Sequence, residues 1–340
     1  PSVVMLIIFA LAASYMMYLV ARTSELTGAT SYEDIWKKVV GSRSAWVPLA
    51  IVWLVTFGCC LAYACMFGDL FASCTRAFGL AAASRTLCLI IVGIFPLLPL
   101  CMLKDLSALA PTSFGALAAV AYTVLVMAIR YADGSYAAGG QYFAGVQASA
   151  YVRGSHIMTM NRSSFVLVNN MAVAYLCHYN GCKYYREYVG QRPEKFKLKI
   201  LESFSMVTMI FGIAMVLGYL TFGERADAVI LNNYSAHDLL ANIARLGMGL
   251  AIVFSFPLMF SGLRESTIAL LTLVSPSYAS FFELVLFQNA LSAGLLITSI
   301  LLAIMVTNAG LVFGLVGSVC GSAIIYVIPC FLFDQANCMF

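Results

Sequence analysis

Long apolar runs alternate with short polar connections along the whole chain of 340 residues. A helix that crosses a bilayer needs about 20 mostly apolar residues, and it satisfies its own backbone because lipid offers no hydrogen bonds. The pattern predicts an all-α integral membrane protein with about nine transmembrane helices and no separate soluble domain. The expected spans are 1–21, 46–72, 86–103, 109–130, 164–180, 203–222, 238–262, 283–306 and 309–333.

Composition agrees with a multi-pass membrane protein. Of the residues, 62% are hydrophobic and 10% are charged, against roughly 25% charged in soluble domains. The net charge of +4 comes without any long basic run, so nucleic-acid binding is not expected. Most of the 11 cysteines lie in apolar runs without zinc-ligand spacing, and we expect them to pack as small apolar side chains. No hydrolase, metal or phosphate-loop motif indicates an enzyme, and no cofactor is expected.

The distribution of Lys and Arg predicts the orientation of the chain in the membrane. With nine spans, one side takes the connections 22–45, 104–108, 181–202 and 263–282, which hold 12 of the 19 basic residues. Cytoplasmic loops carry such an excess. We expect this side to face the cytosol, or the matrix or stroma of an organelle. The pattern does not distinguish the plasma membrane from the vacuole or an organelle.

The segment 164–180 differs from a plain anchor, since it reads SFVLVNNMAVAYLCHYN. Polar side chains inside a span are costly unless they face a cavity or a partner. Transporters expose backbone dipoles to a substrate in interrupted helices of this type. We expect the helix to be broken here and to contribute to a substrate site, the alternative being helix–helix hydrogen bonding without a ligand. The candidate substrate-binding residues are Asn169, Asn170, Tyr175, His178 and Asn180.

The span 238–262 contains Pro257 near its end. Proline has no N–H and its ring clashes with the carbonyl four residues back, so we expect a kink between Val253 and Pro257. A carbonyl left without its helical donor, together with the Ser255 hydroxyl, is a good ligand set for a hard cation. Val253 and Ser255 are therefore the candidate ion ligands, and a bare proline kink is the alternative.

The last span, 309–333, carries Gly310, Gly314, Gly317 and Gly321. Small residues four apart let helices approach closely. We expect these glycines to form a packing face.

A series of runs resembles the amino acid/auxin permease family, nearest to its sodium-coupled neutral amino acid transporter branch. In the family's order they are SYEDIWKKVVG at 31–41, LAYACMFGDLF at 61–71, LCHYNGCKYYREY at 176–188, GYLTFG at 218–223, ILNNYS at 230–235, ARLGMGLAIVFSFPLMFSGLRE at 244–265 and GLVFGLVGSVCGSAIIYVIPCF at 310–331.

The resemblance implies an incomplete inverted repeat of the LeuT type. The first-repeat helices would occupy 1–130, an outer loop 131–163, and the second-repeat helices 164–333. On this register the family's first and last helices are not among the predicted spans. The broken helix 164–180 would begin the second repeat, and the turn at Ser255 would help form a sodium site.

The implied function is secondary active transport of amino acids or similar small zwitterions, coupled to sodium or protons. The alternative is a non-transporting structural subunit of a larger membrane complex derived from this family. In the first case the partners are an amino acid substrate and membrane lipid, and in the second they include other protein subunits.

Overall fold

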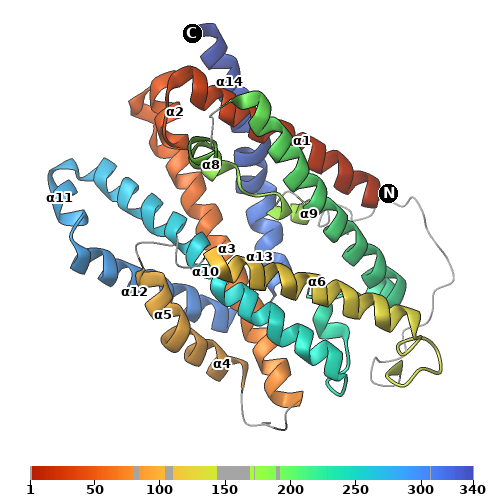
Figure 1. Cartoon of the computed structure of the whole chain (residues 1–340). Coiled ribbons are helices and arrows are strands. Elements are labelled where there is room, and N and C mark those ends of the chain that lie inside the picture. Colours follow the sequence, from red (N-terminus) through yellow and green to blue (C-terminus); the bar gives the residue numbers. More distant parts are fainter. Residues whose placement is uncertain are drawn as a thin grey trace.

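The computed structural model of the chain is all-helical over the residues it describes (Figure 1). These residues are 2–77, 79, 84–103, 110–143, 169–171, 173–188, 192–227, 229–306 and 308–339. The longer helices are α1 (Ser2–Thr27), α3 (Trp46–Ala77), α6 (Ala110–Ala132), α9 (Pro193–Phe222), α10 (Leu239–Val274) and α12 (Val285–Met305). The shorter ones are α2 (Tyr32–Val39), α4 (Arg85–Val92), α5 (Leu98–Met102), α8 (Gly181–Glu187), α11 (Ala279–Phe282), α13 (Ala309–Val316) and α14 (Ile328–Met339).

Eight helical stretches of the described chain are long and apolar enough to cross a membrane, in the order that the hydrophobic pattern predicts. They are Ser2–Thr27, Ser42–Ala77, Arg85–Met102, Thr112–Ala132, Pro193–Phe222, Leu239–Val274, Val285–Met305 and Ala309–Met339. The largest difference from the expected bounds is at the end of α10, which continues to Val274 instead of residue 262. The next largest is at α9, which begins at Pro193 instead of residue 203. Its first turns carry Lys and Glu, which are good helix formers but end an apolar run. The all-α membrane fold is therefore confirmed.

The expected ninth span, 164–180, is not one of these eight stretches. Residues 164–168 and 172 lie outside the described part, and the remainder is interrupted. Helix occupies 169–171 and 173–174, ends before Tyr175, and resumes as a short 3-10 turn, His178–Asn180, that leads into α8. The expected break between Asn169 and Asn180 is confirmed within these residues.

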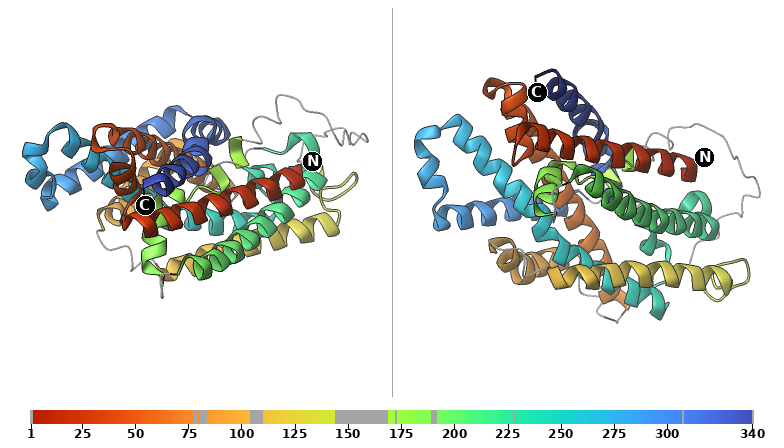
Figure 2. Two further views of the ribbon diagram at one scale, coloured as in Figure 1. Left: turned by 90° about the horizontal axis from the view of Figure 1, so that it is seen from above. Right: turned by 45° about the horizontal axis from the view of Figure 1, so that its top comes forward.

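The centre of the molecule is the crossing of α3 and α10, which pack more extensively than any other pair of described helices (Figures 1 and 2). Phe67 of α3 and Phe256 of α10 are fully buried there, with ring centroids 6.5 Å apart in an edge-to-face arrangement. The Trp53 indole also donates a hydrogen bond of 2.9 Å to the hydroxyl of Thr267. The helices α6, α12 and α13 pack around this pair, while α1 and α9 lie side by side at the edge.

Several connections on the predicted basic side meet at one end of the bundle. Arg186 of α8 donates to the carbonyl oxygens of Gly28 and Ala29, just after α1, at 2.7 and 3.0 Å. Lys183 of α8 forms an ion pair of 2.7 Å with Glu265, in the second half of α10. The structure therefore places these parts together, as the alternation of spans requires.

The glycine face of the last span is partly as expected. A Cβ atom on Gly317 would lie 2.2 Å from the carbonyl oxygen of Asn169, so only glycine lets the last span approach the broken segment this closely. Gly321 lies on the same side, where a Cβ would be 3.8 Å from Val173. Gly314 has no described atom within 4 Å of such a Cβ, and its assignment to a packing face is wrong. Gly317 lies in a π-helical stretch, Gly317–Gly321, which changes the helical phase after Gly314.

Candidate functional site

The break in the helix after Ala174 creates the irregular backbone of the candidate site. Cys177 has φ −146° and ψ 0°, outside the helical region, and short-range bonds span the break between described residues. The N–H of Leu176 donates to Val173 at 3.0 Å, and that of Asn180 donates to Cys177 at 3.1 Å. Other backbone groups are thus left without the ladder of a continuous helix, a condition tolerated at membrane depth only against protein or water.

Two of the predicted site residues fix this break to α1 and α9. The His178 ring is fully buried, with Nε2 2.9 Å from the carbonyl oxygen of Ala13. The Tyr175 hydroxyl lies 3.0 Å from that of Thr208 in α9 and donates to the Leu6 carbonyl oxygen at 3.4 Å. Neither residue lines the cavity described below. Both hold the chain in position on either side of Cys177.

The two asparagines before the break are placed differently from each other. The backbone of Asn169 packs against Gly317. The Asn170 side-chain oxygen, Oδ1, is buried and has no hydrogen-bond partner among the described residues. Buried polar atoms without a partner are rare in folded proteins.

Asn180 and Ser255 meet at one cavity of about 170 Å³, between the break and the middle of α10. Liquid water takes about 30 Å³ per molecule, so the cavity has room for a small polar solute. Among the described residues no Asp, Glu, Lys or Arg lines it, and its polar groups are hydroxyls, an amide and backbone. The lining consists of Tyr63, Leu176, Cys177, Tyr179, Asn180, Tyr184, Ser255, Leu258 and Met259.

The α10 side of the cavity flanks Pro257, with Ser255 before it and Leu258 and Met259 after it. The helix continues through Pro257, which supplies no N–H for the carbonyl oxygen of Val253. The Val253 side chain is buried in the central core, whereas Ser255 lines the cavity. The Ser255 hydroxyl makes no hydrogen bond to any described residue, so it is available to a bound solute or ion.

Sequence reasoning did not identify Tyr63, Tyr179, Tyr184 and Met259 as lining residues. Tyr63 lies on α3, inside an apolar run in which nothing distinguishes it from a packing residue. The Tyr179 hydroxyl donates to the Met259 sulfur at 3.2 Å, which connects the break to α10. The tyrosines near Asn180 were a usable signal, because a hydroxyl-bearing ring at a break can present a polar tip.

A larger recess, of about 590 Å³, lies elsewhere, between α1 and α9. It contains far fewer polar groups for its size, and none of the candidate site residues lines it. Volume alone would favour this recess as the candidate substrate site. A polar solute, however, needs hydrogen-bonding groups, and the smaller cavity offers hydroxyls and an amide.

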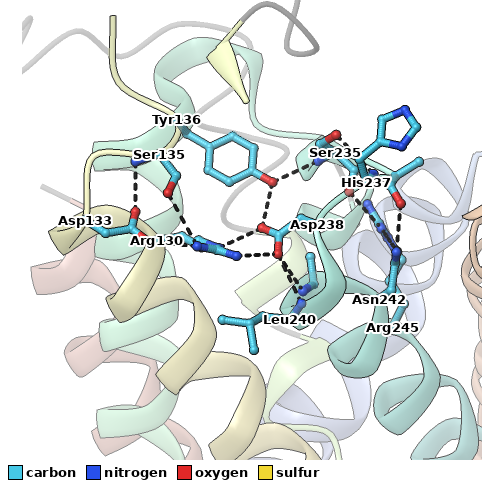
Figure 3. A network of polar contacts seen from close by, with 12 residues as sticks. Arg130, Asp133, Ser135, Tyr136, Ser235, His237, Asp238, Leu240, Asn242 and Arg245 are labelled. Carbon is cyan, nitrogen blue, oxygen red and sulfur yellow. Dashed lines mark hydrogen bonds and ion pairs between the residues drawn. The ribbon is translucent and has the colours of Figure 1, made fainter. Parts of the chain in front are cut away.

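A buried ion pair lies at the end of the bundle opposite to Lys183 and Glu265 (Figure 3). Asp238, which caps the start of α10, is fully buried. The Arg130 guanidinium donates two hydrogen bonds to its carboxylate, at 2.8 and 2.7 Å, and the Tyr136 hydroxyl donates a third at 2.9 Å. Such a bidentate pair, with the remaining lone pairs satisfied, fixes the end of α6 against the start of α10.

Arg130 also forms an ion pair of 2.8 Å with Asp133, which lies in the loop after α6. Burial disfavours the charged form of Asp133, but hydrogen bonds from the hydroxyl and N–H of Ser135 and the charge of Arg130 outweigh it and lower the pKa of this carboxyl. The loop is thus held by a charged Asp133 at neutral pH.

Comparison with known proteins decides the family. A family model described as "Transmembrane amino acid transporter protein" matches residues 1–333, nearly the whole chain. The chain belongs to the transmembrane amino acid transporter family. It is accordingly a multi-pass membrane protein of a transporter family and not an enzyme.

Two relatives show the extent of the similarity. Amino acid transporter AVT6E of Arabidopsis thaliana is 26% identical over 294 residues, which cover 80% of this chain and 58% of that protein. Vacuolar amino acid transporter 2 of Saccharomyces cerevisiae is 24% identical over 320 residues, 89% of this chain and 63% of that protein. The chain thus spans less than two thirds of the length of either relative.

Proposed function

We propose that this chain forms the core of a secondary active transporter for amino acids or similar small zwitterions, with its substrate bound in the cavity between the helix break and α10. The observation that carries the proposal is that Asn180 and Ser255, from elements far apart in the chain, line the same cavity. Family membership supports amino acids as the substrate class.

The cavity suits a small neutral amino acid. Its lining has no charged side chain among the described residues, so a solute with net charge would bind without a counter-ion. The amino and carboxylate groups of a zwitterion instead find the amide of Asn180, the hydroxyls of Tyr63 and Ser255, and the open backbone at Cys177. Hydrogen bonds to charged groups contribute about 1.5–3 kcal/mol each, more than those between neutral groups.

Sodium or a proton drives the transport in this proposal. The carbonyl oxygen of Val253, which Pro257 cannot supply with a donor, and the hydroxyl of Ser255 form the start of an oxygen ligand set. Ser255 lines the cavity, so an ion held by this turn of α10 would be coupled to the substrate through Ser255. The sequence runs that resemble the sodium-coupled neutral amino acid transporter branch support sodium as the coupling ion in this proposal.

Tyr175 and His178 act as positioning residues in this proposal. Their bonds to α1 and α9 hold the break, so that movement of those two helices is transmitted to Cys177 and Asn180. Alternating access then requires α1 and α9 to move relative to the α3–α10 pair. No covalent chemistry takes part.

Uptake by the full-length protein in proteoliposomes tests the proposal. Labelled alanine is supplied under an imposed sodium gradient, an imposed proton gradient or neither. We expect gradient-dependent accumulation, and Asn180→Ala raises KM roughly tenfold or more through the lost hydrogen bond to a charged group. Asn337→Ala, at an exposed position of α14, is the matched control and leaves KM unchanged. A wild-type protein that is folded but takes up no amino acid under any gradient would favour a structural subunit.

A further inference from the structure

The chain that leads out of the helix break follows α10 from the cavity toward the predicted cytosolic end. At the wall of the cavity, the Tyr179 hydroxyl donates to the Met259 sulfur at 3.2 Å. Three residues further along α10, a Cβ atom on Gly262 would lie 3.3 Å from the Tyr179 ring, so glycine lets the ring lie against the helix. Three residues beyond that, Glu265 forms an ion pair of 2.7 Å with Lys183. Residues three apart on a helix are neighbours on its surface, so these contacts form a continuous strip.

The same part of the chain is attached firmly to α1. A Cβ atom on the buried Gly181 would lie 2.9 Å from the Val20 side chain and 3.0 Å from the Met17 sulfur, so the start of α8 packs directly on α1. The guanidinium of Arg186 donates to two carbonyl oxygens just after α1. Hydrogen bonds from a charged donor are stronger than those between neutral groups. These contacts make α1 and α8 one packed unit.

The contact of α8 with α10 is weaker than its contact with α1. The side chains of Lys183 and Glu265 are 47% and 56% exposed. Ion pairs at such exposure contribute little, because water solvates the separate charges well and salt screens their attraction. The strip along α10 therefore ends in a contact that separates at small cost, whereas the packing of α8 on α1 does not.

We propose that Lys183 and Glu265 form a gate between the cavity and the predicted cytosolic side, which opens when α1 and α8 move together away from α10. The gate rests on the proposed function, since it needs a cavity that exchanges its solute with that side. Glu265 lies about 9 Å beyond Met259 along α10, at about 1.5 Å per residue. With the pair formed, Tyr179 stays against Gly262 and covers this route. When the pair separates, Tyr179 withdraws with α8.

Thiol labelling without substrate tests the gate. Cys177 lines the cavity and serves as the reporter. The full-length protein, in vesicles whose predicted cytosolic face is outward, reacts with an impermeant anionic methanethiosulfonate, and peptide mass spectrometry measures the modification of Cys177. In Lys183→Glu two carboxylates face each other. We expect Cys177 to react about threefold faster than in the wild type, the size expected for one exposed ion pair. Added negative charge by itself would repel this reagent.

An exchanged pair and a matched control make the result specific. Lys183→Glu combined with Glu265→Lys restores an ion pair at the same place, and should return the rate of Cys177 labelling to the wild-type value. Lys199→Glu breaks an exposed ion pair of 2.8 Å with Glu202, but both residues lie on α9, so this variant should not label faster than the wild type. A wild-type rate in Lys183→Glu, no restoration by the exchanged pair, or equal acceleration in Lys199→Glu overturns the gate.

The labelling is read independently of transport, so the two proposals can fail separately. A protein that labels as expected but takes up no amino acid under any gradient keeps the gate and loses the proposed function. A protein that transports, but in which Lys183→Glu does not change the labelling of Cys177, keeps the proposed function and loses the gate.

Discussion

Asn180, at the end of the helix break, and Ser255, in the middle of α10 and two residues before Pro257, line the same small cavity. One belongs to a segment in which polar residues interrupt an apolar run, and the other to a turn in which proline removes a backbone donor. Both are places where a membrane helix cannot satisfy its own backbone. Their meeting is the reason that we propose this cavity as the substrate site.

The ion pair between Arg130 and Asp238 is expected to be the strongest polar contact at its end of the bundle. Asp238→Asn removes the charge that faces Arg130, and we expect a loss of about 3 kcal/mol in the free energy of unfolding. The matched variant Asp133→Asn acts on the same arginine at a more exposed carboxylate, and it should lose less than about 1 kcal/mol. Thermal unfolding of the purified protein in detergent measures both. Equal losses would contradict the assignment of Asp238 as the buried anchor.

The last span should depend on glycine at one position and not at its neighbour. Gly317→Ala forces a Cβ against the Asn169 carbonyl oxygen, and overpacking of this kind costs about 1–3 kcal/mol. Gly314→Ala, one turn earlier and open, should change the unfolding free energy by less than about 0.5 kcal/mol. Unfolding midpoints of the two variants make the comparison. Similar midpoints would mean that the broken segment does not pack on Gly317.

The two basic connections that Arg186 joins by hydrogen bonds, 22–45 and 181–202, are expected to label from one face of the membrane. Single cysteines at Lys38 and Lys197, in a background without the exposed Cys330 and Cys338, should react with an impermeant reagent from the same side. A cysteine at Asp227, which follows α9 at the other end, should react only from the opposite side. Labelling of Lys38 and Lys197 from opposite faces would refute the arrangement of spans.

Much of the fold was predictable because lipid allows so few structures. Any apolar run long enough to cross the bilayer has to be helical, so eight stretches appeared in the expected order. The break near His178 was also predictable, since polar residues there have no other inexpensive arrangement. The start of α9 was not predictable from hydrophobicity. The helix continues beyond the membrane through Lys195 and Lys197, whereas the apolar run that predicts a span begins only after them.

The site was predictable only in part, because a sequence does not fix which way an irregular segment turns. Asn180 and His178 are two residues apart in the same break, yet Asn180 lines the cavity and His178 turns toward Ala13. The contribution of Tyr63 depends on how α3 packs against the break, a long-range relationship without a local signal. Gly314 failed as a packing residue because the π-helical stretch after it changes the phase of the helix.

The sodium dependence of uptake by Ser255→Ala tests the central claim most directly. Full-length wild type, Ser255→Ala and Ser261→Ala are compared in proteoliposomes, by labelled alanine uptake across a range of sodium concentrations. Ser261 lies on the same helix, bonds its own helix backbone at Leu258 and does not line the cavity, so its replacement should leave the curve unchanged. We predict that Ser255→Ala raises the half-saturating sodium concentration about fivefold, the equivalent of about 1 kcal/mol for one lost oxygen ligand, at equal expression. Uptake by Ser255→Ala with wild-type sodium dependence would contradict the ion site and leave a proline turn without a ligand.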